Sequence, residues 1–228
     1  GRLWVRPLDS LIAQPLQGTE GASFGPFWSA DSRFIGFFAA DKLKKIAANG
    51  GPPQTLCDAS SYGMGGTWNR DGTIVFSVPK PNGLYRVSAV GGQPTEITKL
   101  DASRKETTHV WPHFLPDGRH FLYLATSSEK QNWGVYVASL DSGDRKLLLN
   151  SESEAQYSEP GYLLYVRDAT LMAQQFDVRR LEMKGEAFPI AEGTGYLTNG
   201  SVSFSVSPGG VLADRAGLHG RNQRTLVW

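Results

Sequence analysis

"VWPHFLPDGRHFLYL", residues 110–124, reads as two short strands joined by a tight turn. An aromatic, apolar segment runs to Phe114, the tetrad at 115–118 follows, and a second apolar run continues to Leu124. Pro, Asp and Gly in such a tetrad suit a reversal, because Pro presets φ, Asp bonds to its own backbone and Gly accepts positive φ. The stretch therefore predicts an antiparallel hairpin.

The same hairpin pattern recurs along the chain. Equivalent tetrads occupy residues 29–32, 69–72, 115–118, 158–161 and 207–210. Each repeat has an aromatic first strand, an apolar second strand, an alternating third strand and a fourth strand after a Gly-rich bend. A period in the forties with several short strands is typical of propeller blades. The sequence thus predicts an all-β propeller of four-stranded antiparallel blades.

We expect one domain, residues 1–228, with five blades. The blades are predicted near 25–58, 65–98, 110–149, 154–191 and 201–228, the last closed by residues 1–18. Two segments, Leu3–Leu8 and Arg224–Trp228, both read as the third strand of the closing blade. The displaced segment would leave an open edge that favours a homodimer.

Aromatic residues in the first strands are predicted to fill the space between blades. Trp28, Trp68 and Phe114 occupy such positions, and a large ring buries much apolar surface between stacked sheets. A platform on which sugars or bases stack is the alternative for these rings.

Composition limits the classes of function. The chain of 228 residues has a net charge of +1, from 23 basic and 22 acidic residues, which does not suit a nucleic-acid binder. One cysteine, Cys57, excludes an intrachain disulfide framework. No apolar run approaches the ~18 residues that a membrane-spanning helix needs, so we expect no membrane insertion. The abrupt start and end predict a piece of a longer protein.

The tetrads and the bends "NGGPP" and "VGGQP" resemble TolB-like β-propeller repeats. More specifically, four segments resemble the C-terminal propeller of bacterial serine/threonine protein kinases: "LWVRPLDS" (3–10), "FLPDGRHFLYLA" (114–125), "GVYVASLDSG" (134–143) and "GEAFPIAE" (185–192). The resemblance implies a sensor or interaction region outside the cytoplasmic membrane, in the periplasm. The catalytic motifs of a kinase are missing from this sequence, so the chain is not expected to transfer phosphate.

The loops that enter first strands and those that join second to third strands share one face of a propeller, the channel mouth, where ligands usually bind. The polar insert "SRKETTH" at 103–109 is the preferred lip of a ligand pocket, with Arg104, Lys105 and His109 as donors. His109 and His219 both fall in mouth loops, where an approach across the channel is the alternative to two ordinary surface histidines. The complete set of predicted ligand-binding residues is Arg104, Lys105, Glu106, His109, Trp133, Glu154, Asp168 and His219.

Three functions remain open from the sequence. The first is a non-catalytic binding module for a small ligand, a peptide or a cell-envelope component. The second is a hydrolase or lyase that uses His and carboxylates at the mouth, with a divalent cation as its cofactor. The third is a truncated propeller that assembles with copies of itself. The sequence has no "GxSxG" or "HExxH" motif and identifies no catalytic residue, and we expect no metal site and no cofactor.

Overall fold

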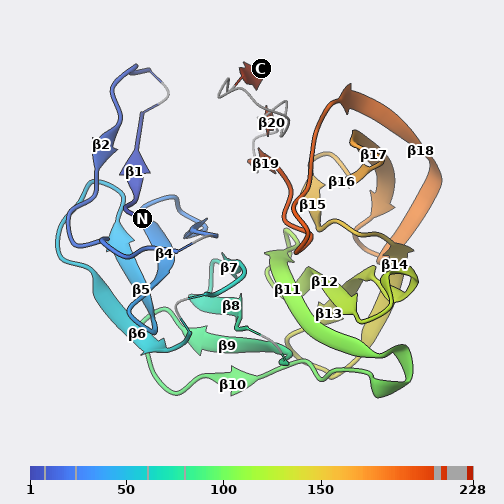
Figure 1. Ribbon diagram of the computed structural model, residues 1–228, viewed down its shortest axis with the longest axis horizontal. Helices are drawn as coiled ribbons and strands as arrows, with labels where there is room; N and C mark the ends of the chain where they lie inside the picture. Colours follow the sequence, from blue (N-terminus) through green and yellow to red (C-terminus); the bar gives the residue numbers. More distant parts are fainter. Residues whose placement is uncertain are drawn as a thin grey trace. The chain divides into compact units, whose positions relative to one another are not determined.

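A computed structural model describes residues 1–7, 9–23, 25–60, 62–79, 81–207, 212–214 and 225–227 (Figure 1). Regular structure in these residues is almost entirely β-strand, with two short 3-10 helices. The chain divides into two compact units, one formed by residues 1–100 and 108–114 and the other by 101–107 and 115–228. Among the described residues, none of the helices is long and apolar enough to cross a membrane.

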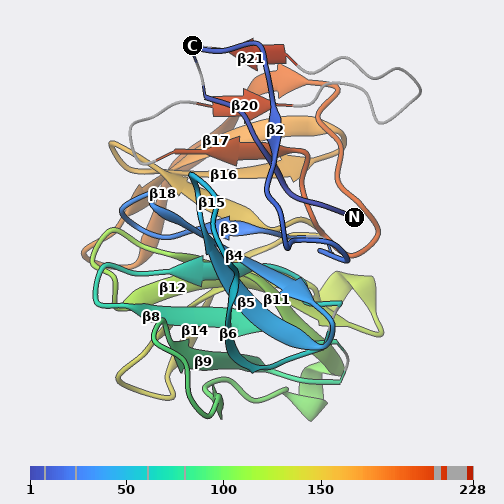
Figure 2. The same cartoon turned by 90° about the vertical axis from the view of Figure 1, so that its left-hand side faces the viewer.

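The first unit holds two four-stranded antiparallel sheets, each a simple meander (Figures 1 and 2). The first sheet consists of β3 (Phe27–Trp28), β4 (Phe34–Ala39), β5 (Lys42–Ala47) and β6 (Gln54–Asp58). The second consists of β7 (Gly66–Trp68), β8 (Thr73–Ser77), β9 (Leu84–Ser88) and β10 (Thr95–Glu96). These sheets match the blades predicted near 25–58 and 65–98.

Phe27 fills the space between these two sheets. Its ring lies where a Cβ on Gly36 or Gly66 would come within 2.4 or 2.3 Å, so only glycine leaves room for it on both sides. Phe38 continues the same core, 6.4 Å from Phe27 between ring centroids. The prediction that Trp28 packs between blades is wrong, because Trp28 is 50% exposed and its neighbour Phe27 takes the buried position.

The N-terminal residues form a separate two-stranded hairpin. It pairs β1 (Trp4–Val5) with β2 (Gln14–Pro15). Leu3 and Val5 pack against the buried side chains of Leu16 and Ile35, which places one face of the hairpin on the first sheet.

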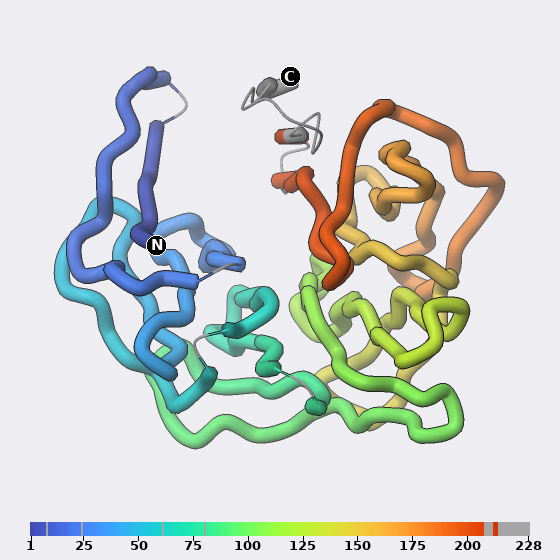
Figure 3. The backbone as a smooth tube through the Cα atoms, in the orientation of Figure 1, coloured from blue at the N-terminus to red at the C-terminus, as the bar shows by residue number. Residues whose placement is uncertain are grey.

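The second unit also holds antiparallel sheets in which consecutive strands pair, and Figure 3 traces its backbone. One sheet has the order β11 (Glu106–Phe114), β12 (His120–Ser127), β13 (Gly134–Ser139) and β14 (Arg145–Asn150). The next has β15 (Ala155–Ser158), β16 (Tyr162–Arg167), β17 (Thr170–Asp177) and β18 (Glu182–Glu192). A three-stranded sheet follows, with β19 (Phe204–Val206), β20 (Leu212–Asp214) and β21 (Thr225–Val227). Within β11, residues 106–107 belong to the second unit and 108–114 to the first.

The third blade begins earlier than the sequence predicts. Residues 103–109 are not one long polar loop, because a 3-10 helix, η1 (Ala102–Arg104), is followed directly by β11. Asp101 caps this helix by accepting a hydrogen bond from the Ser103 backbone N–H at 2.9 Å. Lys105 then takes a left-handed conformation, with φ of 54°, and turns the chain into the strand.

At the C-terminus, β21 pairs with β20 and occupies the third position of the last sheet. β1 pairs with β2 in a sheet of its own. The number of blades, closure of the last one by both chain ends, the single domain and the homodimer remain predictions. His219, Arg224 and Trp228 lie outside the described residues.

Candidate functional site

Several loops meet at one end of the strands of the second unit. They precede β11, β15 and β19 or join β12 to β13, and they comprise residues 101–105, 128–133, 151–154 and 193–203. The loop at 128–133 contains a 3-10 helix, η2 (Lys130–Asn132). These loops are among those that the sequence assigns to the channel mouth.

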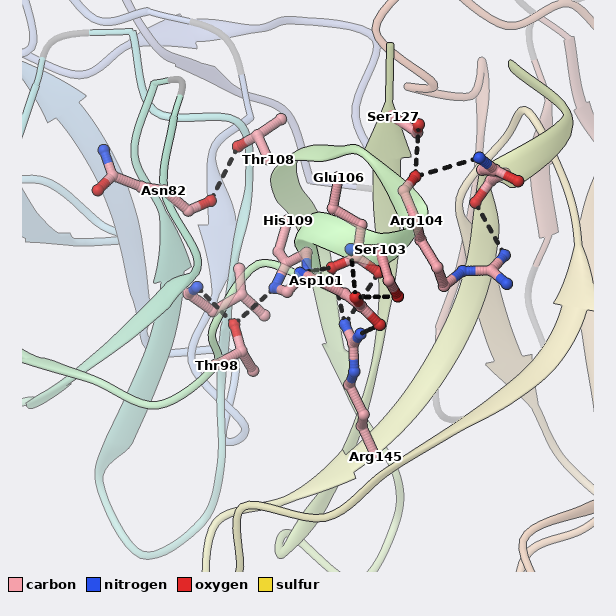
Figure 4. Close-up of polar contacts among 12 residues, drawn as sticks. Asn82, Thr98, Asp101, Ser103, Arg104, Glu106, Thr108, His109, Ser127 and Arg145 are labelled. Atoms are coloured by element: carbon pink, nitrogen blue, oxygen red, sulfur yellow. Dashed lines mark hydrogen bonds and ion pairs between the residues drawn. The ribbon is translucent and has the colours of Figure 1, made fainter. Parts of the chain in front are cut away.

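Hydrogen bonds of Arg104 and Lys105 join the first two of these loops. The Arg104 carbonyl accepts hydrogen bonds from Ser127 Oγ at 2.8 Å and Asn132 Nδ2 at 3.2 Å (Figure 4). The Arg104 guanidinium donates in return to the Asn132 carbonyl at 3.1 Å. The Ser128 N–H donates to the Lys105 carbonyl, also at 3.1 Å. The predicted lip is therefore a firmly held turn.

Glu106 has a structural partner and does not face solvent. Its fully buried carboxylate lies 2.9 Å from Arg145 Nη1, and Arg145 Nη2 lies 3.1 Å from Asp101 Oδ2 (Figure 4). The guanidinium also lies over the Tyr136 ring, 4.9 Å from its centroid. Burial alone would lower the pKa of Arg145, but the Glu106 carboxylate and the Tyr123 hydroxyl raise it overall. Arg145 thus remains a cation that fixes the start of β11.

A row of charged side chains reaches solvent at this end of the unit, and we call it the ion-pair row. Lys105 pairs with Glu129, and Lys130 Nζ lies 2.5 Å from Glu152 Oε2. The Tyr196 hydroxyl donates to the same Glu152 oxygen at 3.2 Å. The row is defined as Lys105, Glu129, Lys130, Glu152 and Tyr196.

The electrostatics of the ion-pair row follow from its hydrogen bonds. The bond with Lys130 lowers the pKa of Glu152, and the same bond raises the pKa of Lys130. Burial, followed by the negative charge of Glu152, raises the pKa of Tyr196, with a smaller contribution from Asp168. At neutral pH the row therefore presents charges of both signs on three different loops, and a fourth loop adds the neutral hydroxyl of Tyr196.

Glu154 lies beneath this surface as a buried acid. Its Oε1 accepts a hydrogen bond from the Val202 N–H at 3.1 Å, and its own N–H donates to the Gly200 carbonyl at 2.9 Å. Burial raises the pKa of Glu154 to about 8, opposed by its hydrogen bonds to Val202 and Gln156. The side chain is thus a neutral acid near pH 7, and it holds residues 200–202 against the start of β15.

Trp133 and Asp168 differ in how far they reach the surface. Trp133 is buried and donates from Nε1 to the Ser127 carbonyl at 2.7 Å, so its ring packs where β13 begins. Asp168 is exposed in the two-residue turn between β16 and β17, where Asp168 and Ala169 both have positive φ, 50° and 58°.

His109 belongs to the first unit and is fully buried in β11. Its Nδ1 lies 2.8 Å from Thr98 Oγ1, which also accepts the Leu84 N–H at 2.7 Å (Figure 4). Its backbone N–H donates to the Asn82 carbonyl at 3.1 Å. The expectation that His109 lies in a mouth loop is wrong, because β11 starts three residues before it. The approach of His109 to His219 remains a prediction.

The described residues contain no cluster of three or more His, Cys, Asp or Glu side chains that could hold a metal ion. Sequence reasoning identified the loop containing Glu129 and Lys130 but did not select either residue. It had no signal for Glu152, Tyr196 or Arg145, because their partners are 22 to 44 positions away in the chain.

No protein-family model and no curated protein matches this chain. Solved structures do. TolB from Acinetobacter baumannii has a TM-score of 0.62 at 13% identity, covering 87% of this chain and 50% of that one. The gluconolactonase XC5397 from Xanthomonas campestris has a TM-score of 0.64 at 14% identity, covering 85% and 69%. An oligogalacturonate lyase in complex with manganese has a TM-score of 0.61 at 10% identity, covering 88% and 63%.

The fold is a β-propeller, like that of TolB. It is built from four-stranded antiparallel blades, as the sequence predicts. The chain spans between half and about two thirds of the length of these three structures. At such low sequence identity the likeness establishes the fold alone, since a propeller carries many unrelated functions.

Proposed function

We propose that this propeller is a non-catalytic module that binds a ligand or protein through the ion-pair row. One observation carries the proposal: loops and turns far apart in the sequence are joined by ion pairs whose charged groups remain in contact with solvent. The Lys130 and Glu152 side chains are 66% and 38% exposed. A ligand that offers its own charges can replace these partners without unfolding the loops, because exposed ion pairs contribute little to stability, ~0–1 kcal/mol.

We further propose that the module is the sensor region of a bacterial receptor-like kinase and works outside the cytoplasm. The four kinase-like segments support this reading, and so does the likeness to TolB. The ligand classes that suit a mixed-charge surface on rigid loops are a peptide, a component of the cell envelope and a small polar molecule.

The test measures binding of muropeptides, envelope polysaccharides and a mixed-charge peptide set to the immobilised chain. A Lys105→Glu/Lys130→Glu variant reverses both cations of the row. It is expected to weaken binding about tenfold or more, because it places like charges opposite Glu129 and Glu152 and on the ligand-facing surface.

The matched control is Arg119→Glu. Arg119 pairs with Asp141 at the other end of β12, about 26 Å from the ion-pair row by the rise of a strand. The Arg119→Glu variant reverses the charge of an exposed, paired cation but leaves the ion-pair row unchanged, so binding should persist. Equal loss of binding in both variants, or no loss in the double variant, would contradict the proposal.

The enzymatic alternative retains support from two solved structures, the gluconolactonase and the lyase with manganese. It would place a hydrolase or lyase reaction at the same mouth. The chain is assayed on a sugar lactone and on oligogalacturonate, with manganese and after chelation. Metal-dependent turnover would favour this alternative over a pure binding module.

A further inference from the structure

Three Asn-Gly pairs occur in the chain, at 49–50, 82–83 and 199–200. In such a pair the glycine N can attack the asparagine amide carbon with little hindrance, because glycine has no Cβ. Asparagine is accordingly one of the thermolabile residues of proteins. The three pairs are alike in local sequence, so the surrounding structure decides which of them reacts.

Hydrogen bonds and close packing restrain the pair at 82–83. Asn82 Nδ2 donates to the Pro79 carbonyl at 2.9 Å, and the Asn82 carbonyl accepts the His109 N–H at 3.1 Å. Gly83 is buried so tightly that a Cβ would lie 1.8 Å from the Thr98 carbonyl oxygen. Closing a new ring here would disrupt the contacts of residues 82–83 with Thr98 and His109.

The pair at 199–200 is also restrained. Asn199 Oδ1 accepts the Ser201 N–H at 3.1 Å, and the buried Gly200 donates to the Leu197 carbonyl at 2.8 Å. A Cβ on Gly200 would meet Leu124 Cδ2 at 2.2 Å. The Gly200 carbonyl in turn accepts a hydrogen bond from the Glu154 N–H. Movement of this backbone would therefore break the attachment of residues 200–202 to β15.

The pair at 49–50 lies in the exposed turn between β5 and β6. Asn49 is exposed, and its side chain makes no hydrogen bond within the described part of the chain. A Cβ added to Gly50 or to Gly51 would meet no other atom within 4 Å, and their φ values are 96° and 111°. One hydrogen bond, from the Gly50 N–H to the Ala47 carbonyl at 2.9 Å, closes the turn, and exposed turns open at little free-energy cost.

We propose that Asn49 is a site of spontaneous backbone-assisted deamidation in the folded protein. The Gly50 nitrogen forms a bond to Asn49 Cγ, the Cγ–Nδ2 bond breaks, and Nδ2 leaves as ammonia with the peptide proton. Water then opens the succinimide at either carbonyl. Opening between Cγ and nitrogen restores the normal peptide as aspartate, and opening at the main-chain carbonyl leaves isoaspartate.

The experiment incubates the folded chain in mildly alkaline buffer and follows each Asn-Gly pair by peptide mapping with mass spectrometry. Asn49 is expected to convert about tenfold or more faster than Asn82 and Asn199, since local opening must precede reaction at the restrained pairs. Hydroxylamine cleaves the succinimide, so it should cut the incubated chain between residues 49 and 50.

Two controls distinguish the effect of the folded structure on the deamidation rate from the effect of the local sequence. In denaturant the three pairs should convert at similar rates, because the restraints are gone. Asn49→Gln should remove conversion at this position while leaving the melting temperature and ligand binding unchanged, since the turn lies in the first unit and outside the ion-pair row. Equal rates at the three pairs in the folded chain, or an Asn49 that stays intact while the restrained pairs convert, would overturn the proposal.

Discussion

At the scale of single residues, Glu154 makes the stability of the chain depend on pH. Its folded-state pKa is about 8, above the ordinary value of 4.5, chiefly because of burial. The folded protein therefore holds the proton more tightly than the unfolded chain does. Its stabilising effect is complete below pH 4.5 and is lost as the pH rises towards 8.

We predict that Glu154→Gln removes most of this pH dependence. Glutamine keeps the size of the side chain and an oxygen for the Val202 N–H, but it cannot ionise. At pH values well above 8 the variant should be more stable than the natural chain by roughly 4–5 kcal/mol, the free energy of a pKa shift from 4.5 to about 8. Urea unfolding across the pH range measures the difference, and Glu182→Gln, an exposed carboxylate on β18, is the control. Parallel pH profiles for the Glu154 variant and the natural chain would refute the prediction.

At the scale of elements, two strand connections store backbone strain. The turn between β4 and β5 has Ala40 and Asp41 at φ of 51° and 54°, and the turn between β16 and β17 has Asp168 and Ala169 in the same region. These two-residue turns have the twist that antiparallel hairpins need, but they favour glycine and asparagine. Alanine at positive φ is therefore sterically strained in these turns, whereas glycine would not be.

We predict that Ala40→Gly and Ala169→Gly each stabilise the chain, by up to about 1 kcal/mol, because relief of strain exceeds the extra freedom of glycine in the unfolded chain. Thermal unfolding of each variant measures the change. Ala30→Gly is the matched control, since Ala30 is equally exposed in a turn but is not among the residues with positive φ. The control should be destabilised, and a loss of stability in all three variants would show that the strain is not relieved.

At the scale of the whole molecule, β11 contributes residues to both compact units. Loss of either unit removes part of a strand from the other, so we predict one cooperative unfolding transition. Cys57 reports on the first unit, because burial raises the pKa of its thiol to about 11 and keeps it unreactive while folded. Trp133 is buried in the second unit and reports by fluorescence.

Thiol labelling of Cys57 and Trp133 emission should therefore change at the same denaturant concentration. A Trp133→Phe variant identifies which part of the emission change belongs to this side chain. Two separated transitions would mean that the units unfold independently.

The repeated pattern of strand, turn and strand was enough to predict the blades, because alternation of side chains and the chemistry of tight turns act within a few residues. The tetrads and the Gly-rich bends therefore located the sheets to within a few positions. Local pattern could not place His109 inside β11, since η1 and the left-handed Lys105 shorten the loop before it.

The sequence alone determined the all-β propeller class and the order of strands within each sheet, and it predicted which loops gather at one end of the strands. Only the tertiary structure decided which polar residues remain available there. Glu106 is paired with Arg145, Glu154 is buried and accepts the Val202 N–H, and Lys130 stays at the surface beside Glu152. The physical reason is that burial and ion pairing depend on partners tens of residues away, whereas strands and turns depend on their neighbours in the chain.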